Sequence, residues 1–276
     1  MDTISLPEKS PSLNGPSLSE RVKRRLVKVE SMRQLGTAYR RAVRSAKAIK
    51  TPELASFYAE DIFCSQVVER LLRVDSCCID VGAHIGSVLN QFLQLAPNGR
   101  HIAVEPVAYK AQWLRTQYPE VTVFDVALSD KESEAIFHQL TKQSGYSSLT
   151  PPSLDDDDEN DVTWSVKTSL LDHLIPSGQR VDFIKIDVVG GELGVLKGST
   201  RIIAEQKPAI LFESNQFCLQ AADVNSEEIF DFFNSVGYAI YLPQGWLHQQ
   251  SALSREGFAH SMEYPFTTFN YLAVPV

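Results

Sequence analysis

Four carboxylates stand where short apolar runs of this sequence end, and that placement could give them chemistry. Asp80 closes CCID, Glu105 closes IAVE, Asp187 closes FIKID and Glu213 closes ILFE. Apolar runs of this length are typical of buried strands. Ligands of open α/β sheets bind at the carboxyl ends of the strands. These side chains are therefore candidates to accept hydrogen bonds from hydroxyl groups, to hold a cation or to remove a proton.

The stretch SCCIDVGAHIGSVL predicts a strand, a tight turn and a helix, which is the entry to a nucleotide site. Gly82 and Gly86 permit the turn. A dinucleotide fingerprint needs a second glycine where this chain has His84, so that the backbone can approach a pyrophosphate. The bulky residue disfavours NAD. It favours a ligand that carries adenosine without pyrophosphate, such as S-adenosylmethionine.

Two further strand ends are consistent with an adenosine site. Glu105, followed by Pro106, ends the second predicted strand, where an acidic residue can accept both hydroxyls of a ribose. The third run, VTVFDVALSD, brings the small residues Val126 and Ala127 to a position that leaves room for an adenine ring.

The run FIKIDVVGGEL carries two charges within an apolar strand. Lys185 and Asp187 point to the same face, and both are costly to bury without a partner. We expect them to pair or to meet a ligand. Asp187, beside Gly190 and Gly191, is the better placed to face a pocket.

Short apolar runs alternate with helical patterns from Ser76 onward, which predicts an α/β fold with a mostly parallel sheet and helices on both faces. We expect an insertion at about 130–168, where EAIFHQL and VTWSVKT alternate like antiparallel strands. The seven strands of the main sheet are expected at 77–81, 101–105, 121–126, 181–187, 208–213, 237–242 and 269–274.

The N-terminal region differs in charge from the rest. Residues 1–50 hold 12 Lys+Arg and 4 Asp+Glu, out of 26 and 34 in the whole chain. We expect a disordered tail at 1–16, a helical extension at 17–73 that could form a homodimer contact, and the main domain at 74–276. The acidic body disfavours nucleic acid as a partner.

Other features of the sequence favour a cytoplasmic protein without a membrane span. No apolar run has the length of a signal peptide core or of a transmembrane helix. The four cysteines lack metal-binding spacings and are expected to be buried, reduced thiols. The acidic run Asp155–Asp158 is interpreted as a solvated loop or as a lid that attracts a cationic substrate.

The order of these motifs resembles the FkbM family of S-adenosylmethionine-dependent methyltransferases. The resemblance implies the class I methyltransferase fold, a Rossmann-like seven-stranded sheet with an antiparallel last strand, and O-methylation of a small-molecule hydroxyl in a sugar or a natural-product intermediate. It runs from about Tyr58 to Pro275 through IDVGAHIGS, VEP, DVALSD, SGYSSL, IKIDVVGGELGVLKG, ILFES and FNYLAVP.

The resemblance also implies roles for residues at the predicted cofactor site. Asp187 would stand near the amino group of the cofactor or near the acceptor. Glu105 with Pro106 would line the ribose, and Val126 with Ala127 would line the adenine. The methionine part would be lined by Asp80, Gly82, Ala83, His84 and Gly86.

This chain departs from the family in two places. His84 stands where asparagine is usual, and Val189 stands where the family has a glutamate. Loss of that carboxylate implies another acceptor, another base or weak activity.

Several alternatives remain open from the sequence alone. The base could be Asp187, Glu213, His84 or His260, in decreasing order, or a Mg²⁺ ion held by Asp187, Glu213 and Asn215 could acidify the hydroxyl. The protein could also be a non-catalytic cofactor-binding or interaction module, or a nicotinamide oxidoreductase. An aromatic acceptor site is suggested by Tyr58, Tyr146, Trp164, Phe217, Trp246 and Phe258.

Overall fold

The computed structural model describes residues 54–140, 147–150 and 162–276. The predicted tail at 1–16, the basic helix within 17–50 and the acidic run 155–158 lie outside the described residues. The described part of the predicted helical extension at 17–73 contains α3, which spans Ala55–Leu71.

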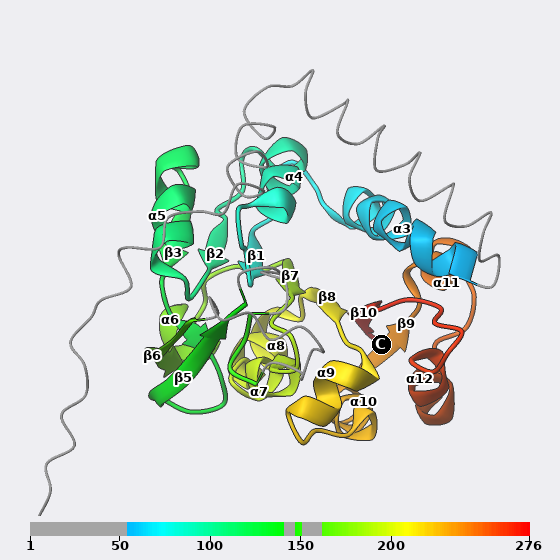
Figure 1. The fold of residues 1–276 in the computed structure, drawn as a ribbon. Helices are drawn as coiled ribbons and strands as arrows, with labels where there is room; N and C mark the ends of the chain where they lie inside the picture. The colour runs from blue at the N-terminus through cyan, green and yellow to red at the C-terminus, as the bar shows by residue number, and fades with distance from the viewer. Residues whose placement is uncertain (1–53, 141–146, 151–161) are drawn as a thin grey trace, which may run out of the picture.

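The main sheet has seven strands in the order β3-β2-β1-β7-β8-β10-β9 (Figure 1). β10 is antiparallel to both of its neighbours, and the other pairs are parallel. The predicted seven-stranded, mostly parallel sheet with an antiparallel last strand is therefore confirmed. The strands are β1 Cys78–Val81, β2 Ile102–Val104, β3 Thr122–Phe124, β7 Phe183–Ile186, β8 Ala209–Glu213, β9 Tyr238–Tyr241 and β10 Asn270–Pro275.

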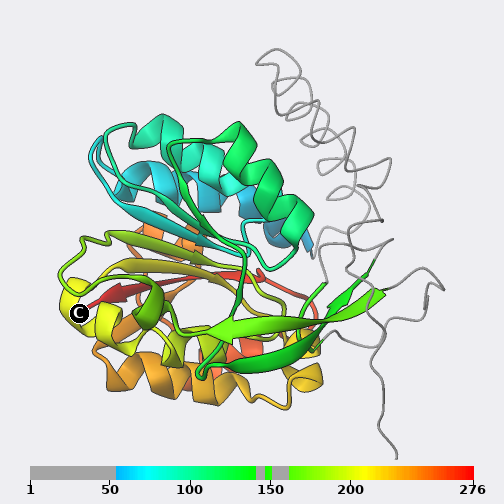
Figure 2. The same ribbon diagram turned by 90° about the vertical axis from the view of Figure 1, so that its left-hand side faces the viewer.

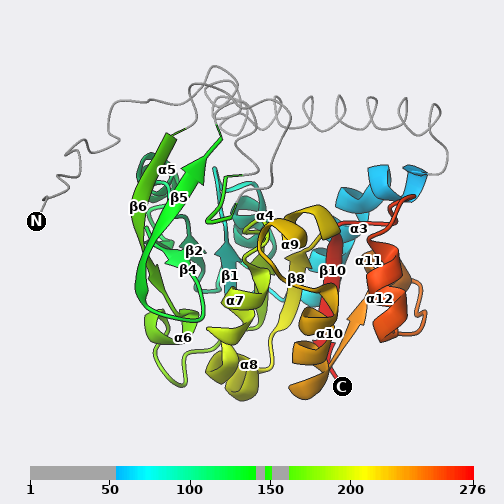
Figure 3. The same ribbon diagram turned by 60° about the horizontal axis from the view of Figure 1, so that its bottom comes forward.

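A second, three-stranded sheet lies on the side of β1 and β2 (Figure 3). β5 (Ser133–Gln139) and β6 (Val162–Ser169) pair antiparallel along their length, as the alternation of their residues predicts. β4 (Ala127–Leu128) pairs parallel with β6.

The predicted third strand, 121–126, was wrong at its end. β3 ends at Phe124, and Ala127 already belongs to the second sheet. Between them Asp125 is exposed and pairs with Arg115 at 2.8 Å. The apolar alternation of VTVFDVAL continues across this break, so periodicity could not reveal that the chain changes sheets.

Helices cover both faces of the main sheet, as expected (Figure 2). One face carries α3, α4 (Ser87–Leu95) and α5 (Ala108–Gln117), with α11 (Pro243–Leu247) packed on α3. The other face carries α7 Glu192–Lys197, α8 Thr200–Gln206, α9 Gln216–Ala221, α10 Ser226–Ser235 and α12 Arg255–Ser261, and the short α6 spans Leu171–Leu174.

The central strands are buried along their whole length, because helices cover them on both sides. Every residue of β1 and β7 is buried, and apolar side chains such as Ile79 and Phe183 fill the two helix–sheet interfaces. Burying one such side chain contributes roughly 1.5–3 kcal/mol. Asp80 and Lys185 are the charged exceptions within these two strands, at 2% and 5% exposure. Such costly positions call for a structural or a functional reason.

Candidate active site

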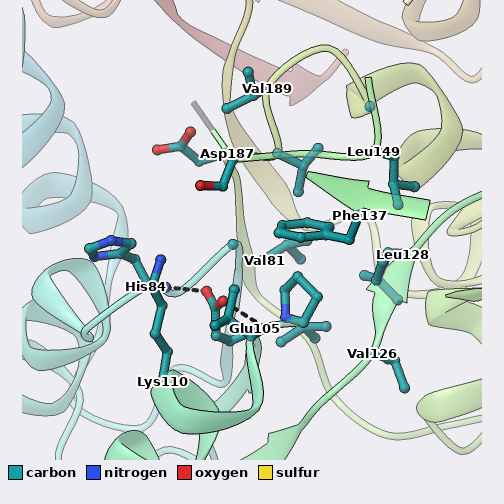
Figure 4. A pocket seen from close by; sticks show the side chains of 18 residues that line it. Val81, His84, Glu105, Lys110, Val126, Leu128, Phe137, Leu149, Asp187 and Val189 are labelled. Carbon is teal, nitrogen blue, oxygen red and sulfur yellow. Dashed lines mark hydrogen bonds between the residues drawn. The ribbon is translucent and has the colours of Figure 1, made fainter. Parts of the chain in front are cut away.

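A cavity of about 290 Å³ lies at the carboxyl ends of β1, β2 and β7 (Figure 4). Its size is at the lower end of the range for small-molecule sites. The turn after β1, the end of β2, the start of α5, the second sheet and the segment 187–191 all contribute to it. The lining residues are Val81, Gly82, His84, Val104, Glu105, Pro106, Val107, Lys110, Val126, Ala127, Leu128, Phe137, Ser147, Leu149, Asp187, Val188, Val189 and Gly191.

Glu105 is held firmly at the end of β2. Its Oε2 accepts a hydrogen bond from the backbone N–H of His84 at 2.8 Å, and its Oε1 accepts one from the N–H of Val107 at 3.0 Å. The residue is 4% exposed. A carboxylate oxygen has more than one acceptor site, so each oxygen can also accept a hydroxyl group. Glu105 therefore fits the pair of hydroxyls of a ribose.

Gly82 is required by a close approach between two strand ends. Its φ is +79°, and a Cβ placed on it would lie 1.9 Å from the carbonyl oxygen of Asp187. The N–H groups of Gly82 and Ala83 donate to Val104 O at 2.9 and 3.1 Å. The turn after β1 is thus fixed between β2 and β7, and only a residue without a side chain fits there.

Asp80 stabilises the start of the helix that follows this turn, and it does not line the cavity. Its Oδ2 accepts a hydrogen bond from the N–H of Leu89, in the first turn of α4, at 3.0 Å. Burial raises the pKa of this carboxyl to about 7, although the Lys185 cation acts in the opposite direction. Ala83 and Gly86 also lie outside the lining, and Gly86 is the residue before α4.

An apolar wall faces Glu105 across the cavity. Val126, Ala127 and Leu128 come from β4 and the residue before it, and Phe137 comes from β5. The Phe137 ring packs on Trp164 with 5.2 Å between ring centroids. The cavity is therefore polar at the end of β2 and apolar toward the second sheet, as a site for ribose and adenine requires.

Lys110 is a charged cavity residue that the sequence analysis missed. It is 1% exposed and begins on the first turn of α5. Figure 4 shows its side chain extending from α5 toward the backbone of His84, beside Glu105. No motif in the sequence distinguishes this lysine from the surface lysines of other helices.

Asp187 lines the cavity from the residue that follows β7. Lys185 Nζ lies 3.7 Å from Asp187 Oδ2 and donates to Ile186 O at 3.1 Å. The expected pairing of Lys185 with Asp187 is thus confirmed. Burial opposes the charge of Lys185, but Asp187 and Glu213 outweigh it, and the pKa of the amine lies above its ordinary value. The Lys185 amine is thus an ion-pair partner that helps to position the Asp187 carboxylate.

Glu213 lies at the end of β8 and outside the cavity lining. Burial, and next the negative charge of Asp187, raise the pKa of this carboxyl well above its ordinary value. Asn215 accepts a hydrogen bond from Cys218 N at 2.9 Å and caps α9. Across the described ranges, no three His, Cys, Asp or Glu side chains form a group that could hold a metal ion.

The other predicted acceptor residues are distributed over the fold. His260 is on α12, where its side chain is 84% exposed and pairs with Glu263 at 3.0 Å. Phe258 is fully buried in the core, and Trp246 stacks under Arg70. Of the predicted aromatic residues, Tyr146 lies outside the described residues, and Tyr58, Trp164, Phe217, Trp246 and Phe258 do not line the cavity.

The expected burial of the cysteines holds for two of the four. Cys78 and Cys218 are buried, Cys64 and Cys77 are partly exposed, and all four are free thiols. Within the described ranges, no helix has the length and apolar character needed to cross a membrane.

The strand order, the antiparallel β10, the glycine turn after β1 and the acidic residue at the end of β2 define a class I methyltransferase. The chain belongs to the FkbM family of these enzymes, because the methyltransferase FkbM domain matches residues 80–240, more than half of the chain. Its chemistry is accordingly S-adenosylmethionine-dependent methylation. The donor set fits that cofactor, since Glu105 suits the ribose hydroxyls and Asp187 suits a cationic group.

One relative is similar to this chain over about half of the chain. The antimetabolite synthetase AmbE of Pseudomonas aeruginosa is 29% identical over 160 residues, which is 49% of this chain and 8% of AmbE. This chain therefore matches only a small part of that relative.

Two solved methyltransferases illustrate the structural distance. The methyltransferase FkbM from Methylobacillus flagellatus is 18% identical, with 74% of this chain and 45% of that chain covered and a TM-score of 0.44. The plantazolicin methyltransferase BpumL, solved with a desmethylPZN analogue and SAH, is 9% identical, with 94% and 98% covered and a TM-score of 0.42.

Proposed function

We propose that this protein is an O-methyltransferase that transfers the methyl group of S-adenosylmethionine to a hydroxyl group of a small molecule. The observation that carries the proposal is Glu105, which two backbone amides fix at the end of β2, one at each carboxylate oxygen. The similarity to a segment of an antimetabolite synthetase supports a natural-product intermediate as the acceptor. We expect this activity in the cytoplasm.

Each part of the cavity has a place in this proposal. Glu105 and Pro106 would contact the ribose, and Val126 and Ala127 would contact the adenine. The turn at Gly82 and His84 would leave room for the methionine part. Asp187, with Lys185 behind it, would attract the positive charges of the amino acid and of the sulfonium.

Methyl transfer requires alignment more than covalent help from the protein. The bond between methyl and sulfur breaks as the bond between methyl and the acceptor oxygen forms, and the hydroxyl proton leaves to a base. Holding the three atoms in line near contact distance supplies much of the rate. Asp187 is the first candidate for the base, because it lines the cavity with a side chain that is 40% exposed, and His84 is the second.

The test is an acceptor screen with methyl transfer as the readout. The protein is incubated with S-adenosylmethionine and with sugars, phenols or polyketide alcohols, and S-adenosylhomocysteine and methylated product are measured by mass spectrometry. We expect one hydroxyl class to be methylated and Asp187→Asn to lower kcat by about 100-fold or more. Methylation of amines or thiols alone would contradict O-methylation, and cofactor binding without transfer to any acceptor would favour the non-catalytic alternative.

A further inference from the structure

The cavity wall contains a valine in an unfavourable backbone conformation. Val189 has a φ of +56°, and Gly190 after it has a φ of +90°. A β-branched residue rarely adopts a positive φ, so something in the surrounding structure must impose it. Val189 is 7% exposed and lines the cavity, next to Asp187 and Val188 in the sequence (Figure 4).

Glu192 is the residue that holds this turn. Its Oε1 accepts hydrogen bonds from the N–H of Val188 at 3.4 Å and of Gly190 at 3.2 Å, the two amides that flank Val189. The residue is 1% exposed. Its Oε2 is also buried and finds no hydrogen-bond partner among the described residues. A buried carboxyl with one unsatisfied oxygen is costly, so stability alone does not account for it.

The segment 187–191 packs closely against the turn at Gly82 and against Cys218 of α9. The carbonyl of Asp187 takes the space that a Cβ on Gly82 would need, and a Cβ on Gly190 would lie 2.7 Å from Cys218 O. A movement of the segment would therefore press on the turn after β1. Glu192 thus fixes one wall of the cavity and supports the loop on which the cofactor would lie.

The groups facing Glu192 come from three elements. They are Asp187 after β7, Glu213 of β8 and Cys218 of α9. Burial, and the nearby Asp187 carboxylate, raise the pKa of Glu192 to about 7 although its backbone hydrogen bonds act against them. A cation placed beside Asp187 would reverse that balance and favour the ionised carboxyl.

We propose that Glu192 is a positioning residue of the cofactor cavity, which fixes Val189 and Asp187 through the two backbone amides and loses a proton when the cationic cofactor binds. The inference rests on the proposed use of S-adenosylmethionine. It adds a residue outside the cavity lining, and a coupling between cofactor and proton, to that function.

The first test needs no ligand. Hydrogen exchange is measured for residues 187–191 in the full chain, in Glu192→Ala and in Glu192→Gln. We expect about tenfold faster exchange at Val188 and Gly190 in the alanine variant, and near-normal exchange in the glutamine variant, because glutamine retains the acceptor oxygen. The control is Asp172→Ala, which removes acceptors for Arg201 N and Ile202 N at the start of α8, outside the cavity lining. Exchange at 187–191 that is equal in wild type and in Glu192→Ala would overturn the proposal.

The second test measures proton release. S-adenosylmethionine is titrated by calorimetry at pH 7 in two buffers of different ionisation enthalpy. Wild type and Asp172→Ala should release a proton fraction. Glu192→Gln should release a smaller fraction, since Glu213 keeps its raised pKa, and Glu192→Ala should bind about tenfold more weakly. Proton release by Glu192→Gln equal to that of wild type would overturn the coupling. If wild type does not bind the cofactor, the proposed function and the coupling both fail, and the exchange data alone decide whether Glu192 positions the wall.

Discussion

The two edges of the cavity are built on different physical principles. At the β1–β2 edge, Asp80 and Glu105 accept hydrogen bonds from backbone amides, so local geometry fixes each carboxyl. At the β7–β8 edge, Asp187 lies 3.7 Å from the buried amine of Lys185, and burial together with the Asp187 charge raises the pKa values of Glu192 and Glu213. Glu192 Oε2 there has no hydrogen-bond partner within the described residues.

This difference indicates a division of labour. The β1–β2 edge is preorganised for neutral hydroxyl groups, whose recognition depends on the positions of acceptors. The β7–β8 edge holds Glu192 and Glu213 in a poorly solvated place that raises both pKa values, and a cationic cofactor there would favour their ionised forms. Changes at Glu105 should therefore act through geometry, and changes at the second edge should depend on pH and on the charge of the ligand.

The largest expected effect is at the β7–β8 edge. Lys185→Met should lower the free energy of unfolding by roughly 3 kcal/mol, because Asp187 and Glu213 lose their shared cation. This value is at the low end for breaking a buried pair, since the Asp187 side chain is 40% exposed. Urea unfolding at pH 7.5 measures it. Adding Glu213→Gln should recover part of the loss, and full additivity of the two changes would argue against coupling.

At the β1–β2 edge, Glu105→Ala should weaken S-adenosylmethionine binding by about 100-fold or more. The ribose would lose two charge-assisted hydrogen bonds, and the amides of His84 and Val107 would lose their acceptors. Calorimetry measures the affinity. The control is Glu134→Ala, an exposed carboxylate on β5. Affinities of the two variants within threefold of each other would remove Glu105 from the site.

The close approach of the two edges can be tested separately from backbone conformation. Gly82 and Gly237 have φ values of +79° and +77°, but a Cβ on Gly82 would strike Asp187 O whereas a Cβ on Gly237 meets nothing within 4 Å. Gly237→Ala should cost about 1 kcal/mol of unfolding free energy, and Gly82→Ala about 2 kcal/mol more. Thermal unfolding of both variants measures the difference. Equal costs would show that the contact between the edges is unimportant.

The smallest expected effect concerns the pH dependence of stability. Asp80 has its ordinary pKa of 3.8 in the unfolded chain and a pKa of about 7 in the fold. Because the folded state binds more protons between these values, its contribution is full below about pH 4 and is lost as the pH rises through about 7.

Asp80→Asn should therefore flatten the decline in unfolding free energy, by roughly 2 kcal/mol between pH 5 and 7. Chemical unfolding at several pH values measures this slope. Part of the decline should remain, since Glu192 has a pKa raised in the same direction. A wild type whose stability rises across this range would contradict the assignment.

The sequence predicts the main sheet well because its strands are buried on both faces and read as apolar runs. It also locates Glu105 and Asp187, since the carboxyl ends of neighbouring parallel strands must lie together. Each of these inferences uses residues that are close in the sequence or a rule of topology.

Features that depend on distant contacts were not predictable in this way. The chain leaves the main sheet after Phe124 because β4 pairs with Thr168 and Ser169, far along the chain. Phe137 reaches the cavity for the same reason. In the sequence, Lys110 and Glu192 have the pattern of ordinary exposed helix residues, and only packing buries them. The run DVVGG likewise does not predict the positive φ of Val189.

The central claim is that this cavity binds S-adenosylmethionine, and calorimetric titration of the wild-type protein tests it most directly. Titrations with S-adenosylmethionine and, separately, with NAD should show binding of the methyl donor alone, with a Kd on the order of 1–100 μM. Binding of NAD in preference to the methyl donor, or of neither ligand, would contradict the account.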